Sequence, residues 1–292
     1  MEYLGFIIAL WGIYGMQILL LHLVVGEMGL LALCQGVFFG CGAYGVAIAA
    51  NSGLGLLPAI GVALLVAVFV AMVLGISLYR LAGDEYALAT FAAALVFHDV
   101  VLHWVSVTGG AMGITMPVLF PDYDMSHVLL IQLLVIGTLV LLALEVTRRW
   151  RAAPLGRTIN TMREDEILAA GMAKSVERNR IIAFGISAVG GAVGGACYAF
   201  VVGVVDPGAF DPMVSVLFVA MIIIGGTGST LGPILGAGLI VGLPELLRFA
   251  DLSGSSAAHI KQLVFGVLLY VIVAFRPQGL LGRLSIGVER RV

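Results

Sequence analysis

The stretch "LLPAIGVALLVAVFVAMVLGISLY" at residues 56–79 runs without a charged side chain. A helix needs about 20 apolar residues to cross a hydrocarbon layer roughly 30 Å thick, because it rises about 1.5 Å per residue. The whole chain of 292 residues is 61% hydrophobic, with a mean hydropathy of +1.12. One soluble core would not bury so much apolar surface. The sequence therefore predicts a helical membrane protein.

Hydropathy predicts about nine membrane spans (eight to ten), which makes the fold class an all-α polytopic membrane protein with some short or broken helices. The predicted spans are 4–25, 28–50, 56–79, 86–105, 127–146, 181–203, 213–225, 230–249 and 261–275. All 292 residues are expected to form one transmembrane domain.

The basic residues predict the topology. Eight of the fifteen Lys and Arg residues lie from Arg148 to Arg180, and four more lie from Arg276 to the C-terminus. Basic segments next to spans favour the cytoplasmic side. Segment 147–180 and the C-terminus are therefore predicted to be cytoplasmic, and alternation places the N-terminus and the loops 106–126 and 204–212 outside.

The stretch "GGTGSTLGPILGAG" (225–238) breaks the apolar pattern, since seven of its fourteen residues are Gly or Pro. Irregular backbone at membrane depth must be buried in protein or line a wet cavity. This makes the break a candidate for the translocation path, with a tight re-entrant turn of no substrate role as an equal alternative. The path candidates here are Gly225, Gly226, Thr227, Gly228 and Ser229.

Small residues four apart let helix backbones approach closely. Such pairs occur at Gly190 and Gly194, Gly232 and Gly236, and Gly238 and Gly242. They predict a tightly packed bundle.

Ionisable residues inside apolar runs are costly, so they usually face a bundle interior or reach to an interface. They are His22, Glu27, His98, Asp99, His103 and Glu245. Asp99 is the best candidate to face a polar path. A position within a turn of the outer interface is an equal alternative for it.

The sequence offers no energy source of its own. A nucleotide-binding Walker A loop ends in Gly-Lys-Ser/Thr, but Lys174 follows Ala173 and Lys261 follows Ile260. The stretch "GCGAYG" (40–45) fits G-x-G-x-x-G but lies inside a hydrophobic span, which favours helix packing over dinucleotide binding.

Metal and disulfide chemistry find no support in the sequence either. The histidines lack ligand-like spacing, and Cys34, Cys41 and Cys197 sit in apolar runs as packing residues. We therefore expect no cofactor and no metal.

The charged stretch "GRTINTMREDEILAAGMAKSVERNR" (156–180) holds nine charged side chains in a chain that is only 11% charged. Thr161 and Glu164 can form a capping box, and Glu164, Asp165 and Glu166 suit the first turn of a helix. The helix is either a solvated connector on the membrane surface or a docking element for a cytoplasmic partner. Its mixed charges and small residues would orient such a partner.

Several motifs follow one another in a recognisable order between residues 80 and 282. They are "LAGDEYALATFAAALVF" (81–97), "VTGGAMGI" (107–114), "GRTINTMREDEILAAGM" (156–172), "AFGISAVGGAVGGACYA" (183–199), "VVDPGAFDPMVSVLFVAMIIIGGTGSTLGPILGAG" (204–238), "LPELLR" (243–248) and "RPQGLLG" (276–282). Together they resemble the inner-membrane permeases of branched-chain amino acid ABC importers, of the M-type subunit. Residues 1–80 are similar to this family only in general character.

This resemblance implies a passive half of a transport channel in the bacterial inner membrane. Its partners would be a homologous H-type permease, two cytoplasmic ATPase subunits that bind the ATP, a periplasmic or surface solute-binding protein and membrane lipid, with no nucleic acid. The resemblance assigns the ATPase contact to a coupling helix at 156–172, within the cytoplasmic coupling segment 147–180. The residues carried over are Gly156, Arg157, Arg163, Glu164, Asp165, Glu166, Ala169, Ala170 and Gly171.

The expected mechanism is alternating access, in which movement of the coupling helix changes the orientation of the packed helices. A self-sufficient secondary transporter or channel is the rival reading. Within the ABC class, urea, a short amide, another amino acid or a sugar are alternative cargoes.

Overall fold

The computed structural model describes residues 2–81, 83–117, 125–153, 156, 176–249, 266–267 and 279–281. Within these residues the chain is a helical bundle, which confirms the predicted all-α class. Its main helices are α1 (Glu2–His22), α2 (Gln35–Asn51), α3 (Leu56–Leu78), α4 (Gly83–His103), α6 (Met125–Ala152), α9 (Val176–Val202), α10 (Pro212–Gly225) and α11 (Gly232–Phe249).

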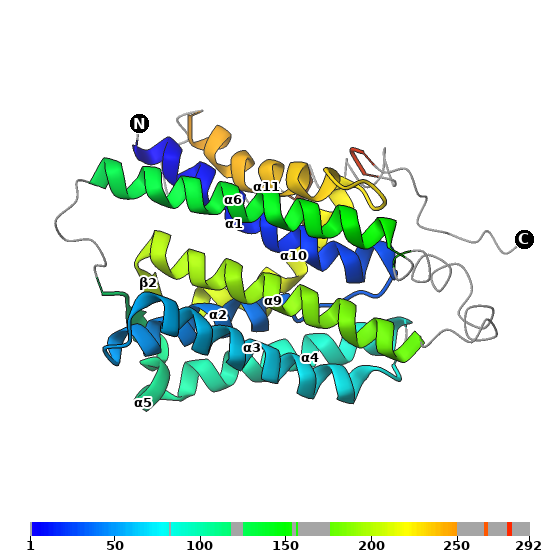
Figure 1. The fold of residues 1–292 in the computed structure, drawn as a ribbon, viewed down its shortest axis with the longest axis horizontal. Helices are drawn as coiled ribbons and strands as arrows, with labels where there is room; N and C mark the ends of the chain where they lie inside the picture. The colour runs from blue at the N-terminus through cyan, green and yellow to red at the C-terminus, as the bar shows by residue number, and fades with distance from the viewer. Residues whose placement is uncertain are drawn as a thin grey trace, which may run out of the picture.

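The bundle has two ends, which lie left and right in Figure 1. The start of α1, the short helix α5 (Val105–Thr108) and the paired strands β1 (Ile114–Thr115) and β2 (Val204–Val205) lie at the left, which we call the strand end. Helix α6 ends and α9 begins at the right, which we call the Arg151 end.

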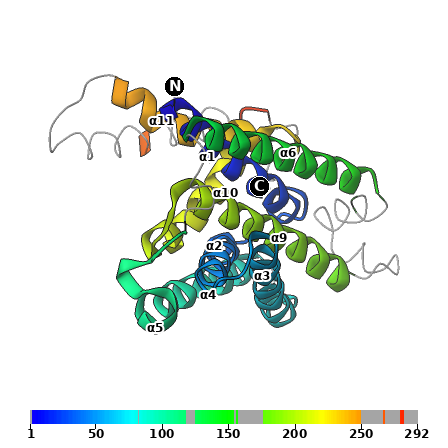
Figure 2. The ribbon, with the colours of Figure 1, turned by 60° about the vertical axis from the view of Figure 1, so that its left-hand side comes forward.

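Helix α9 lies between two groups of helices. Figure 2 shows α2, α3 and α4 on one side of α9, and α1, α6 and α11 on the other, as Figure 1 does. Five helical segments of the described part are long and apolar enough to cross a membrane: Tyr3–Glu27, Leu56–Leu78, Gly83–His103, His127–Ala152 and Glu177–Val202. The predicted spans 56–79 and 86–105 match α3 and α4 closely, whereas the span 261–275 lies outside the described residues except for 266–267.

The predicted span 28–50 is wrong in its first part. Helix α1 continues as a π-helical segment, Leu23–Glu27, and the chain then runs without helix through residues 28–34. Gly29 has a φ of +71°, a conformation that suits glycine and ends the helix. Hydropathy misses this break because Met28, Leu30 and Ala32 are apolar and buried whatever the backbone conformation.

The backbone of this irregular segment finds its partners inside the protein. The Leu33 N–H donates to Thr90 Oγ1 of α4 over 3.0 Å, and the Leu30 N–H donates to the Val24 carbonyl over 3.2 Å. Because Thr90 is fully buried, the Leu33 end of the segment is packed inside the bundle, as irregular backbone at membrane depth requires, whereas Gly29 and Leu31 are exposed.

Two short helices begin side by side within the bundle. Helices α2 and α10 have 17 and 14 residues, fewer than the roughly 20 of a full span. The Gly36 N–H in the first turn of α2 donates to Ser215 Oγ in the first turn of α10, over 2.9 Å. From there α2 runs to the strand end, where Asn51 binds the Thr115 carbonyl, and α10 runs to the Arg151 end.

Glycine allows the closest helix contacts in the bundle. A Cβ at Gly195 of α9 would overlap the Phe39 carbonyl oxygen of α2, and a Cβ at Gly42 of α2 would overlap the Ala192 carbonyl oxygen. The predicted pair Gly190 and Gly194 also packs closely, against Leu20 and Gln17 of α1. The prediction of close packing through small residues is confirmed at these positions.

The second predicted glycine pair joins α10 to α11, where a Cβ at Gly236 would overlap the Met221 carbonyl oxygen. In the third pair, Gly238 packs against Trp11 of α1, whereas Gly242 has no described atom within 4 Å of its would-be Cβ.

Candidate functional site

The predicted ATPase-contact residues lie outside the described part of the chain, apart from Gly156. Those outside are Arg157, Arg163, Glu164, Asp165, Glu166, Ala169, Ala170 and Gly171. Gly156 is buried against the end of α6, where a Cβ would overlap the Trp150 carbonyl oxygen and approach the Arg151 Cα to 3.0 Å. Gly156 itself therefore lies directly against the last turn of α6.

A cluster of polar side chains joins three elements at that point. The Arg151 guanidinium donates from Nε to Glu27 Oε1 over 2.5 Å and from Nη1 to Thr230 Oγ1 over 2.7 Å. Its Nη2 also pairs with Glu27 Oε1 and lies 3.0 Å from His22 Nε2. One side chain of α6 thus contacts the end of the first span and the loop between α10 and α11.

The cluster is shielded from solvent, because His22 and Glu27 are 0% and 5% exposed and the Arg151 side chain is 22% exposed. Removing one partner of a buried ion pair leaves an uncompensated charge and costs about 3–5 kcal/mol. The four side chains therefore stabilise this end of the bundle only as a set.

The predicted break between α10 and α11 is confirmed, and the non-helical residues are 226–231. Gly226 and Gly228 have φ of +103° and +96°, and Ser229 Oγ accepts a hydrogen bond from the Gly232 N–H at the start of α11 over 2.8 Å. The Leu280 and Leu281 N–H groups donate to the Ile224 and Gly225 carbonyls. The loop is thus covered by residues 279–281 as well as held by Arg151.

The path candidates do not come together. Asp99 is exposed on α4, one turn before the helix ends at His103, whose Nδ1 lies 2.9 Å from the Asp99 carbonyl oxygen. This is the strand end, whereas Gly225–Ser229 lie at the Arg151 end (Figure 1). The position of Asp99 agrees with the alternative interpretation, a residue near the outer interface.

The two loops predicted to lie outside are joined at the strand end. Strands β1 and β2 pair antiparallel, with Ile114 opposite Val205, and the Met116 N–H donates to the Gly203 carbonyl over 2.8 Å. A Cβ at Gly113 would overlap the Val205 carbonyl oxygen. Loops far apart in the sequence therefore form one surface, which span prediction did not foresee.

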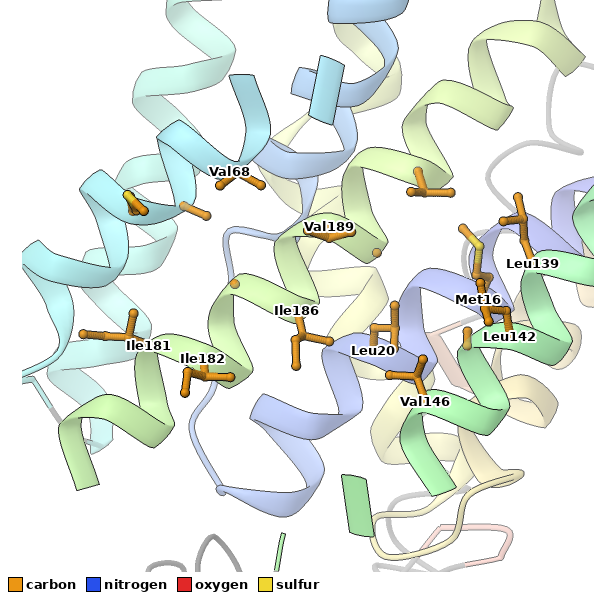
Figure 3. A pocket seen from close by; sticks show the side chains of 16 residues that line it. Met16, Leu20, Val68, Leu139, Leu142, Val146, Ile181, Ile182, Ile186 and Val189 are labelled. Atoms are coloured by element: carbon orange, nitrogen blue, oxygen red, sulfur yellow. The ribbon is translucent and has the colours of Figure 1, made fainter. Parts of the chain in front are cut away.

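A hollow of about 510 Å³ lies between α1, α3, α6 and α9. Figure 3 shows Met16 and Leu20, Val68, Leu139, and Ile186 at its lining, one or more from each helix. Its whole lining is apolar side chains and glycine, so a zwitterionic amino acid would leave both of its charges unpaired there. The hollow suits acyl chains or an apolar helix, not a polar solute.

Sequence reasoning missed Arg151 and Thr230 as site residues. It did single out His22 and Glu27 as ionisable groups in an apolar run, which was the available signal. Their partner lies 124 or more residues away, among several arginines, so only the fold identifies it.

The family model described as "Branched-chain amino acid transport system / permease component" matches residues 3–273. The high-affinity branched-chain amino acid transport system permease proteins LivM of Escherichia coli (strain K12) and Salmonella typhimurium (strain LT2) are each 33% identical over 286 residues. Each comparison covers 89% of this chain and 66% of the relative, so the chain spans just under two-thirds of the relatives' length. No solved structure matches the chain.

Proposed function

The chain belongs to the family of permease components of branched-chain amino acid transport systems, and from this we propose that it forms one transmembrane half of an ATP-driven ABC importer. Its cargo would be branched-chain or related amino acids. The observation that best supports a driven, passive subunit is the buried attachment of Gly156 to the last turn of α6, next to Arg151. A movement of the coupling helix would reach the bundle directly at that point.

The proposed subunit binds no ATP itself and needs no cofactor. Two cytoplasmic ATPase subunits would hydrolyse ATP, a homologous H-type permease would form the other half of the channel, and a periplasmic or surface binding protein would deliver the solute. This division of labour accounts for the lack of a Walker A loop around Lys174 and Lys261.

The subunit would be a multi-pass protein of the bacterial inner membrane. Its Arg151 end would face the cytoplasm. Basic residues gather at that end: Arg148, Arg149 and Arg151 in the last turns of α6, and Arg178 and Arg180 in the first turn and a half of α9. Basic segments favour the cytoplasmic side. The N-terminus and the paired loops of the strand end would then face outward, where the binding protein would dock.

Transport would proceed by alternating access. Closure of the ATPases would shift the coupling helix and change the packing of the helices attached to it. The irregular backbone at Gly225–Ser229 is the proposed inner part of the path, and Asp99, exposed near the end of α4, is left out of it.

The second break, at residues 28–34, is a feature that a stand-alone secondary transporter would share, because such proteins place broken helices around a central site. An ion-coupled carrier also needs a buried carboxylate that can exchange its ion. Glu27 is the only buried carboxylate among the described side chains, and Arg151 already occupies it. This favours the driven subunit.

The cargo can be tested by competition. We expect the assembled importer, with its binding protein and ATP, to take up labelled leucine. A large excess of isoleucine or valine should reduce that uptake at least about tenfold, because a competitor of similar affinity displaces the label by mass action. Urea and acetamide serve as competitors from the alternative cargo class, because they carry neutral amide groups and lack both the charged α-groups and the branched chain. Inhibition by urea or acetamide alone would assign the importer to short amides instead.

A further inference from the structure

Arg151 contacts Glu27, directly before the irregular segment 28–34, and Thr230 within the irregular loop 226–231. Glu27 closes the π-helical turn from which residues 28–34 lead into α2, and Thr230 lies in the loop that joins α10 to α11. We propose that Arg151 is the positioning residue through which the coupling helix acts on both segments. As a result, the first turns of α2 and α10, which meet inside the bundle, would move together. The proposal rests on the function proposed above.

The first link runs from Gly156 to Arg151. Gly156 packs against the Trp150 carbonyl and the Arg151 Cα so closely that no side chain fits between them. Packed interfaces switch between arrangements and do not deform smoothly, so a shift at Gly156 must be passed to the last turn of α6.

The second link divides at the guanidinium group. The Glu27 carboxylate pairs with Nε and Nη2 of Arg151, whereas Thr230 Oγ1 accepts a hydrogen bond from Nη1 over 2.7 Å. The two partners therefore use different edges of the same planar group. A planar group held on two edges transmits rotation as well as translation, which a lysine ammonium could not do in the same way.

The two segments reached by Arg151 converge again inside the bundle. Residues 28–34 lead to Gln35 and Gly36, and Thr230 lies in the loop that follows α10, whose first turn contains Ser215. The Gly36 N–H and Ser215 Oγ are hydrogen-bonded over 2.9 Å, and both residues are buried. Two lines of contact therefore start at Arg151, pass through the two segments, and meet again where α2 is hydrogen-bonded to α10.

A purely structural ion pair is the alternative role, and buried pairs are often less stabilising than apolar residues of the same size. A second ion pair on the same helix provides the comparison. Arg149 binds Glu145 over 2.7 Å, but their side chains are 81% and 48% exposed and touch neither irregular segment. Of the two pairs, only the one at Arg151 has a geometry suited to transmission.

The test uses the complete importer, with both permeases, the ATPases and the binding protein. The variants are Glu27→Gln/Arg151→Gln, which leaves no unpaired charge, and Thr230→Val, which keeps the shape of the side chain. The readout is the ratio of ATPase activity with leucine-loaded binding protein to basal activity, together with thermal stability. The control is Glu145→Gln/Arg149→Gln.

We expect the stimulation ratio to fall about tenfold in the double variant and about fivefold in Thr230→Val, within the usual range of coupling between sites. Basal ATPase activity and the control should match the unmodified importer. Because Thr230 is only partly buried, its variant decides the question even if the double variant fails to assemble. Full stimulation in Thr230→Val, at unchanged stability, would overturn the proposal. An unmodified importer that shows no stimulation would instead contradict the proposed function.

Discussion

Reversing the charges at Arg163, Glu164 and Asp165 is expected to lower ATP-driven uptake by the assembled importer roughly 100-fold, near the upper end of measured coupling between sites. These residues follow Gly156 in the predicted coupling helix. Opposed like charges at an interface cost several kcal/mol, so the reversed helix should no longer seat against the ATPase. Uptake of labelled leucine into proteoliposomes measures the effect.

The amount of the variant in the membrane should not change, because a charged cytoplasmic segment does not enter the hydrocarbon. The matched control reverses Glu177 and Arg178, which are exposed in the first turn of α9 and lie outside the residues that the family resemblance assigns to the ATPase. Normal uptake by the Arg163, Glu164 and Asp165 variant would refute the coupling role.

Gly195→Val is expected to destabilise the bundle by at least about 3 kcal/mol, the upper range for overpacking, because the clash is with backbone. The added side chain would overlap the Phe39 carbonyl oxygen, and its Cβ would lie only 2.9 Å from the Ala43 nitrogen. Helices α2 and α9 would have to separate along their contact. The monodisperse fraction after heating in detergent reports the loss.

Gly185→Val is the matched control on the same helix. No described atom lies within 4 Å of a Cβ built at Gly185, so the substitution should change stability by no more than about 0.5 kcal/mol. Equal stability of the two variants would show that α2 and α9 do not meet as described.

The long helices follow from the sequence because one property decides them. Residues 56–79 carry no charged side chain and are almost all apolar, and α3 ends within one residue of that stretch. Hydropathy measures the cost of leaving a segment in water, and this cost does not depend on whether the segment is helical. The same insensitivity explains the error at residues 28–34, where apolar side chains are buried on a non-helical backbone.

The site was less predictable than the spans, because its parts meet only after folding. Glu27 was visible as a charge in an apolar run, but its partner Arg151 is 124 residues away. Pairing of β1 with β2 involves two residues on each strand and leaves no periodic pattern to detect. Likewise, Gly185 and Gly195 look alike in the sequence, yet only Gly195 faces another backbone closely.

The central claim, that this subunit is driven by separate ATPases, is tested most directly by paired proteoliposomes. One set holds the purified chain alone, with a proton or sodium gradient imposed, and the other holds the complete importer with ATP and binding protein. The account predicts that only the complete importer accumulates labelled leucine. Accumulation by the chain alone, driven by the ion gradient, would contradict it.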